Sequence, residues 1–149
     1  MTEILIVAEQ LDGGLHPVVG ELVTAGQGLE GDRALVVLGA DLSELSKTAT
    51  TLDVDKIYVV EHRLLLEQTS EDLLVAALEQ VCRQTEPRVV LIGRTFLGRD
   101  VGPRLAYRLG VGVAQDCIGL KQNDDSGRVV VTRPVYGGNA VATMAFGQQ

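Results

Sequence analysis

Short apolar runs alternate along most of this chain with longer stretches in which apolar residues recur every three or four positions. Such runs are typical of strands buried on both faces, and the longer spacing is typical of helices that cover a sheet. Because strands that alternate with helices connect through right-handed crossovers, we expect an α/β protein with a three-layer α/β/α arrangement around a mostly parallel sheet. The pattern predicts strands at residues 4–8, 34–38, 57–60, 89–92 and 112–117, and helices at about 17–27, 42–51, 71–85 and 101–109.

Polar residues near these helices predict where the helices begin and how they face. Asp41 and Asp100 are the predicted N-caps of the second and fourth helices, and residues 69–72 have the hydroxyl-to-acid spacing of a capping box. In the fourth helix, Arg104 and Arg108 lie away from the apolar stripe, so we expect them to face solvent.

The pattern changes near the C-terminus. Two short apolar runs at 118–121 and 128–132 flank a polar loop, which predicts an antiparallel β-hairpin. In the segment 133–144, a strand closed by Pro134 is followed by a Gly-Gly break and a second apolar run. The chain has no fixed-period repeat and no linker-like stretch, so residues 1–149 are predicted to form one domain. The unfinished closing pattern favours a domain that is one part of something larger.

Composition excludes several classes of function. Of the 149 residues, 46% are hydrophobic and 3% aromatic, which leaves no stacking platform for single-stranded nucleic acid. The net charge of −7 has the wrong sign for a phosphate backbone or an anionic membrane surface. No apolar segment approaches the roughly 18 residues that span a bilayer, and the N-terminus does not resemble a signal peptide. We expect no nucleic-acid partner, no direct membrane insertion and a cytoplasmic location.

Nucleophilic and metal chemistry have little support in the sequence. His16 and His62 are the only histidines, and neither has a second ligand at helical spacing. A serine nucleophile elbow is missing, and Cys82 and Cys117 are too far apart in the sequence for a redox or zinc motif. We therefore assign no catalytic residue and no metal site.

Anion binding is the one chemistry that the strand ends favour. Ligands of an open parallel sheet collect beyond the carboxyl ends of its strands, where residues 93–100 carry Arg94, Arg99 and a predicted helix start. The alternative is that the glycines of this segment only permit a turn, while Asp100 caps the helix and the arginines are solvated. Neither a dinucleotide fingerprint nor a P-loop lysine motif occurs.

Two sequence blocks carry a resemblance to a known family. Residues 98–110 (GRDVGPRLAYRLG) and 133–143 (RPVYGGNAVAT) resemble the N-terminal domain of the electron transfer flavoprotein alpha subunit, and residues 4–9 are similar to that family's opening strand. The resemblance implies an alpha/beta heterodimer that accepts electrons from flavin dehydrogenases on FAD and passes them to an acceptor. It also implies that this domain packs against the beta subunit.

The resemblance further implies that FAD is held mainly by a C-terminal domain of alpha, which we expect to be absent from this chain. The chain alone is therefore expected to bind no FAD. Arg94, Arg99 and Tyr136 are the candidates for flavin contact in the complete complex or, as the favoured interpretation, for the interdomain or intersubunit interface. The alternative function is a stand-alone small nucleotide-binding α/β protein, similar in layer order to adenine nucleotide alpha hydrolase-like domains.

Overall fold

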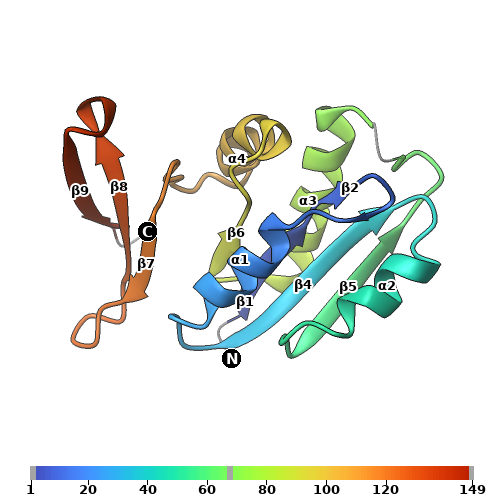
Figure 1. The fold of residues 1–149 in the computed structure, drawn as a ribbon, viewed down its shortest axis with the longest axis horizontal. Helices are drawn as coiled ribbons and strands as arrows, with labels where there is room; N and C mark the ends of the chain where they lie inside the picture. The colour runs from blue at the N-terminus through green and yellow to red at the C-terminus, as the bar shows by residue number, and fades with distance from the viewer. Residues whose placement is uncertain (1–2, 67–68, 148–149) are drawn as a thin grey trace.

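A four-stranded parallel sheet forms the centre of the molecule. The computed structural model describes residues 3–66 and 69–147, and the strand order in the sheet is β5-β4-β1-β6 (Figure 1). Leu5 pairs in register with Ala34 of one neighbouring strand and with Val90 of the other. Four of the five predicted parallel strands are confirmed. They are β1 (Glu3–Ala8), β4 (Asp32–Gly39), β5 (Lys56–Glu61) and β6 (Val89–Leu91).

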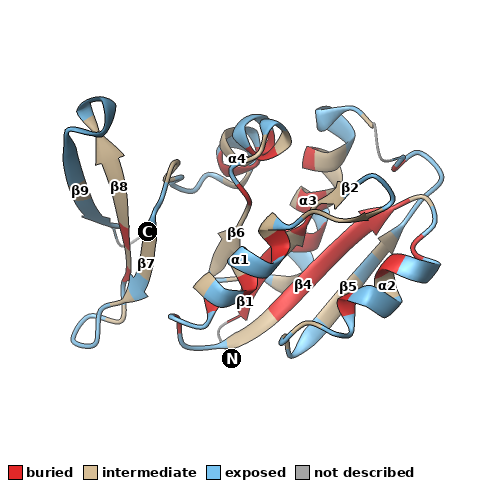
Figure 2. Ribbon diagram, in the orientation of Figure 1, coloured by how far each residue is buried: buried red, intermediate tan, exposed pale blue. Residues whose placement is uncertain are grey.

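Helices cover both faces of this sheet and confirm the three-layer arrangement. Successive side chains of a strand point to opposite faces, so Ile4 and Ile6 pack with α1 and α2, whereas Leu5 packs with α3 and α4. These strand residues are fully buried, and β1 and β4 are the most continuously buried strands (Figure 2). The helices are α1 (Val18–Gly26), α2 (Ser43–Ala49), α3 (Glu71–Thr85) and α4 (Phe96–Leu109).

A two-residue turn joins two very short strands between β1 and α1. Asp12 and Gly13 both have positive φ, 50° and 79°, which is the geometry that tight hairpins favour. The hairpin strands are β2 (Gln10–Leu11) and β3 (Gly14–Leu15). They lie at the carboxyl end of β1, where they cover part of the sheet's upper edge (Figure 1).

Helix α4 begins five residues earlier than predicted. Thr95 is its N-cap and accepts a hydrogen bond from Gly98 N at 3.0 Å, so the prediction that Asp100 caps the helix was wrong. Phe96 in the first turn is 90% exposed and so gives no apolar signal for the helix start. The predicted capping box of α3 was also wrong, because Ser70 is the N-cap without a side-chain bond and Thr69 Oγ1 donates instead to Leu64 O.

A proline inside α4 explains an unusual contact. Pro103 has no N–H, so the carbonyl of Arg99, four residues earlier, lacks its helical donor. Gln115 Nε2 donates to that carbonyl at 3.3 Å and satisfies it from outside the helix. The side chain of Gln115 thereby ties the segment after α4 back to the helix.

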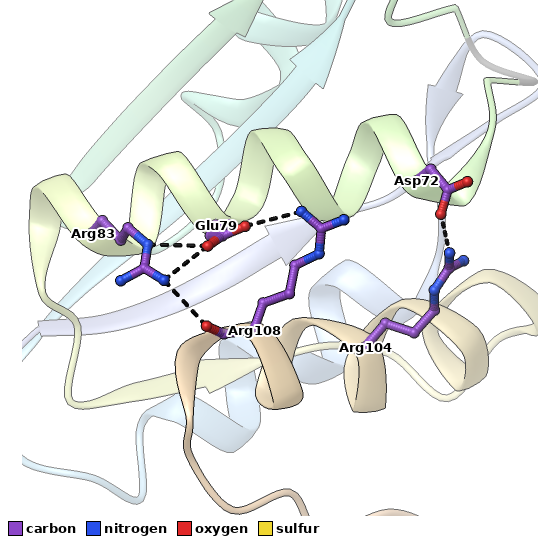
Figure 3. A network of polar contacts seen from close by, with 5 residues as sticks. All are labelled: Asp72, Glu79, Arg83, Arg104 and Arg108. Atoms are coloured by element: carbon purple, nitrogen blue, oxygen red, sulfur yellow. Dashed lines mark hydrogen bonds and ion pairs between the residues drawn. The ribbon is translucent and has the colours of Figure 1, made fainter.

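Ion pairs join α3 to α4 along their length (Figure 3). Glu79 accepts from Arg83 at 2.8 Å and from Arg108 at 3.1 Å, and the hydrogen bonds from these two guanidinium groups lower the pKa of Glu79. Arg104 pairs with Asp72 of α3 and, at 3.0 Å, with Asp100 of its own helix. Arg104 and Arg108 are exposed, as predicted, and they also bridge the two helices through these ion pairs.

The predicted fifth parallel strand does not form. Residues 112–117 have no strand geometry, and Asp116 adopts a left-handed φ of 59°, which interrupts any extended run. Asp116 is held there by an ion pair with Arg94.

The C-terminal residues instead build a separate three-stranded antiparallel sheet with the order β7-β8-β9 (Figure 1). The predicted hairpin is confirmed, since Leu120 pairs with Val131 across β7 and β8. Pro134 does not close a strand as predicted, because it lies within β8 and pairs with Val141 of β9. The strands are β7 (Gly119–Gln122), β8 (Val129–Val135) and β9 (Ala140–Ala145).

Candidate functional site

The crevice that an open parallel sheet offers to ligands lies between β1 and β6, where the strand order reverses. Here the chain's own side chains make two close contacts at the start of α4. Thr95, the cap of α4, donates through Oγ1 to Glu9 Oε2 at 2.6 Å. Gly93 lies so close to Val18 that an added Cβ would stand 2.7 Å from the valine methyl groups. A carboxylate at this helix start repels a phosphate, although Gly93 and Thr95 also line a groove of about 1720 Å³.

Two of the three residues singled out from the sequence meet beside this crevice. Arg94 and Tyr136 line the same cavity of about 670 Å³, although they are far apart in the sequence. Arg94 lies between β6 and α4, and Tyr136 lies in the turn between β8 and β9. Arg99 does not line this cavity; it lies on α4 beside a larger groove.

Arg133 is a third residue of the cavity, and its place in the site could not be recognised from the sequence pattern. Its Nε is buried and has no hydrogen-bond partner among the residues that the structure describes. A buried guanidinium nitrogen without an acceptor is costly, so it favours an acceptor group supplied from outside the chain. The sequence feature that could have indicated this site is a charged residue next to the apolar run of β8. That run by itself predicts only a strand.

The turn that carries Tyr136 is built from three consecutive left-handed residues. Tyr136, Gly137 and Gly138 have φ values of 52°, 66° and 91°. Glycine adopts this geometry without strain, which explains the Gly-Gly pair; Tyr136 adopts it at some cost. The turn leaves the tyrosine ring 83% exposed at the rim of the cavity.

Charge in the cavity is net positive among its described lining residues. Arg94 and Arg133 contribute two cations, and Asp116 contributes one carboxylate that is paired with Arg94. Cys117 lies at the same wall; burial raises the pKa of its thiol, and the nearby charge of Arg133 opposes that rise. The arrangement suits an uncharged or anionic group rich in hydrogen-bond acceptors.

Metal chemistry finds no support in the geometry. Within residues 3–66 and 69–147, no three His, Cys, Asp or Glu side chains gather in a way that could hold a metal ion. Helices long and apolar enough to cross a membrane are likewise absent from this described part.

The fold and cavity together define a class of protein: a three-layer α/β/α domain with a carboxylate at the start of α4 and an antiparallel extension that lines a cationic cavity. The chain belongs to the electron transfer flavoprotein domain family, whose profile matches residues 4–148. The family predicted from the sequence blocks is thereby confirmed.

Several relatives are electron transfer flavoprotein alpha subunits. The chain is 36% identical to that of Thermoanaerobacterium thermosaccharolyticum, over 95% of this chain and 44% of the relative. It is 31% identical to that of Bacillus subtilis, over 93% of this chain and 42% of the relative. It is also 30% identical to the acryloyl-CoA reductase electron transfer subunit beta of Anaerotignum propionicum, over 95% of this chain and 46% of the relative. The chain therefore spans less than half the length of these relatives.

Proposed function

We propose that this chain is the partner-binding part of an electron transfer flavoprotein alpha subunit, which pairs with a beta subunit in an FAD-dependent electron carrier. The carrier moves electrons from flavin dehydrogenases to an acceptor. The observation that carries the proposal is the 36% identity to an alpha subunit over 95% of this chain. A flavin supplies the electron transfer itself, so the role of this chain is to bind and orient.

The exposed strand β9 supports a subunit interface. β9 is the last strand of its sheet, and its six residues from Ala140 to Ala145 include no charge. Val141 is 58% exposed, and Met144 and Phe146 are exposed beside it. Soluble proteins usually protect such edges with charges or cover them, so an uncharged, exposed edge is a surface for another chain.

The cavity residues fit a flavin contact in the assembled carrier. Arg94, Arg133 and Tyr136 would hold a group rich in acceptors, and the volume of about 670 Å³ lies within the range of about 300–1,000 Å³ typical of small-molecule sites. The unpartnered Nε of Arg133 is the observation that supports this fit. We propose that these three side chains touch the flavin, or a part of the cofactor next to it, while other residues of the carrier hold most of it.

The alternative of a stand-alone nucleotide-binding protein is weakened by the carboxylate of Glu9 at the start of α4. The hydrogen bond between Glu9 and Thr95 places a carboxylate where a nucleotide phosphate would sit. Thermal-shift measurements with AMP, ATP and FAD test this alternative. A ligand at 100 times its dissociation constant would add about 2.7 kcal/mol to the free energy of unfolding.

Assembly with a beta subunit tests the proposed interface. Val141→Glu places a charge on β9 and should weaken assembly by at least about tenfold, equivalent to about 1.4 kcal/mol. Val59→Glu is the matched control, because Val59 is a valine of similar exposure, 51%, on the edge strand β5. Analytical size exclusion with the beta subunit measures both variants. Equal weakening by the two substitutions would contradict β9 as the interface.

The flavin spectrum of the assembled carrier tests the cavity. Arg133→Ala should shift the flavin absorption and weaken FAD binding, whereas Arg99→Ala should leave both unchanged because Arg99 lies outside the cavity. If Arg133→Ala weakens subunit assembly and leaves the spectrum unaltered, the cavity belongs to the interface instead.

A further inference from the structure

Helix α4 exposes two aromatic side chains to solvent. The chain has only five aromatic residues, three tyrosines and two phenylalanines, and no tryptophan. Phe96 is 90% exposed in the first turn of α4, and Tyr107 is 88% exposed in the last. Tyrosine and phenylalanine are enriched where one protein contacts another, so large rings that folding leaves uncovered are typical of an interaction surface.

Phe96 and Tyr107 lie on a single stripe of the helix. They are eleven positions apart, so they differ by only about 20° around the helix and by about 16 Å along it. The buried residues Val101 and Leu105 face away from this stripe, into the core. We call the exposed surface the aromatic face, and its members are Phe96, Arg99, Asp100, Pro103, Arg104 and Tyr107.

A pair of opposite charges lies between the two rings. Asp100 accepts from Arg104 of its own helix at 3.0 Å. Arg104 also reaches Asp72 of α3 at the rim of the aromatic face (Figure 3). Exposed ion pairs contribute little to stability, and a guanidinium group has several donors, so both charges of the face can take a further partner at small cost.

The aromatic face is complementary to itself. We propose that it is a self-association site, and that its occupant is the aromatic face of a second copy of the chain. With two α4 helices antiparallel and a two-fold axis midway between the rings, Phe96 of one copy lies opposite Tyr107 of the other. The same axis places Asp100 of one copy within about 1.5 Å, measured along the helix, of Arg104 of the other, on the same side of the contact. Each pairing occurs twice.

The charges of the face select this arrangement. A parallel pair would place Asp100 opposite Asp100 and Arg104 opposite Arg104, and like charges in contact are unfavourable. In the antiparallel pair, Arg99 of one copy lies over Pro103 of the other, so it meets no like charge. A face that carried only one sign of charge could not match itself under a two-fold axis.

The size of the contact sets its expected strength. Helix α4 has 14 residues and is therefore about 21 Å long. One face of such a helix is smaller than the roughly 800 Å² per partner of a standard stable interface. We therefore expect a weak dimer whose population depends on protein concentration.

Sedimentation velocity of the 149-residue chain, from about 10 µM to about 1 mM, measures self-association. The weight-average sedimentation coefficient should rise towards that of a dimer. Tyr107→Ser should weaken self-association by at least about tenfold, because the variant loses both aromatic pairs. Leu66→Ser is the control, since Leu66 is 62% exposed outside α4, and it should leave self-association unchanged. A monomer at every concentration, or equal self-association by the two variants, would overturn the proposal.

Charge reversal tests the two-fold pairing directly. Asp100→Arg and Arg104→Asp should each weaken self-association by at least about tenfold, because like charges then oppose one another. An equimolar mixture of the two variants should associate as well as the original chain, since each guanidinium group of one meets a carboxylate of the other. Circular dichroism checks that both variants are folded. No recovery on mixing would overturn the proposal, because local damage to α4 cannot be repaired by a second variant.

The beta subunit is the other candidate occupant of the aromatic face. Tyr107→Ser that weakens assembly with the beta subunit, while the chain alone stays monomeric, would assign the face to that subunit and overturn the proposal. The proposed function is measured separately, through Val141 of β9 and Arg133 of the cavity. Failure of self-association would therefore leave the proposed function untouched.

Discussion

The parallel sheet and its four helices, together called the body, are built from apolar residues similar to those of the antiparallel sheet β7-β8-β9. The two regions differ in what covers them. In the body, helices lie on both faces, and Leu5 of β1 is 0% exposed. In the antiparallel sheet, β8 buries Val131 against the body, while β9 is exposed at nearly every position. An apolar run therefore predicts a strand but does not tell whether the chain's own helices or another polypeptide will cover it.

Polar contacts join the two regions. The backbone N–H of Arg88 bonds to β1, while its guanidinium donates to Gln122 of β7 at 3.1 Å and to Gly127 O. A second contact lies in the junction, the segment between α4 and β7 together with the residues that it touches. There Arg94 pairs with Asp116. Such exposed contacts contribute far less stability than the apolar core of the body, so we expect the two regions to respond differently to the same kind of substitution.

Truncating a core residue of each region should give the largest difference. Leu5→Ala removes a fully buried side chain and should lower the free energy of unfolding by about 2–5 kcal/mol. Val141→Ala on β9 should change it by no more than about 0.5 kcal/mol. Urea denaturation followed by circular dichroism measures both. A comparable loss from the two substitutions would show that β9 is as well packed as the body.

The two cysteines allow a kinetic comparison. Cys82 of α3 is buried in the body, and burial raises the pKa of its thiol to about 11. Cys117 lies exposed at the junction. At pH 8 a thiol with a pKa of about 11 is roughly 10²-fold less ionised than an ordinary cysteine, so Cys82 should react with a disulfide reagent at least that much more slowly. Cys82→Ser and Cys117→Ser identify which thiol reacts, and fast labelling of Cys82 in the folded chain would contradict the expectation.

A closely packed glycine of the body should tolerate substitution by alanine less well than a glycine on its surface. A Cβ at Gly98 would lie 1.8 Å from the carbonyl oxygen of Gly93, so Gly98→Ala forces the backbone to move and should destabilise by about 1–3 kcal/mol. Gly20→Ala on α1 meets no atom within 4 Å and should stabilise by about 0.5–1 kcal/mol through helix propensity. Thermal melts compare them, and a neutral Gly98→Ala would show that this helix start is loosely packed.

The smallest expected effect is the acid sensitivity of the α3–α4 ion pairs. Hydrogen bonds from Arg83 and Arg108 lower the pKa of Glu79 below its ordinary value of 4.5. A lowered folded-state pKa contributes stability above the unfolded value, and this stability is lost as the pH falls through the folded value. Glu79→Gln should therefore be slightly less stable than the original chain at pH 7 and equally stable near pH 3. Urea midpoints of the variant and the original chain at the two pH values measure this. The same difference in stability at both pH values would show that the charge of Glu79 has no role.

The sequence predicted the body better than the junction because the body depends on local patterns. Apolar runs located β1 and β4, and helical spacing located α3 with its bounds. The predicted strand at 112–117 failed because the ion pair between Arg94 and Asp116 and the left-handed backbone at Asp116 depend on tertiary contacts. No local pattern contains such contacts.

The candidate site also depends on tertiary contacts that no local sequence pattern contains. Arg94 could be named from its place after a predicted strand and Tyr136 from a sequence block, and the structure brings them to one cavity. Arg133 was missed because an unpartnered buried nitrogen is a property of packing, which the order of residues does not reveal. Thr95 was missed as a cap because its helix begins with an exposed phenylalanine rather than a core residue.

The hydrogen bond between Glu9 and Thr95 has a consequence for how this chain responds to its surroundings. The carboxylate acts as an intramolecular competitor for any anion at the start of α4. An anion could bind there only by displacing Glu9 from Thr95, so the loss of that hydrogen bond would be subtracted from its binding free energy.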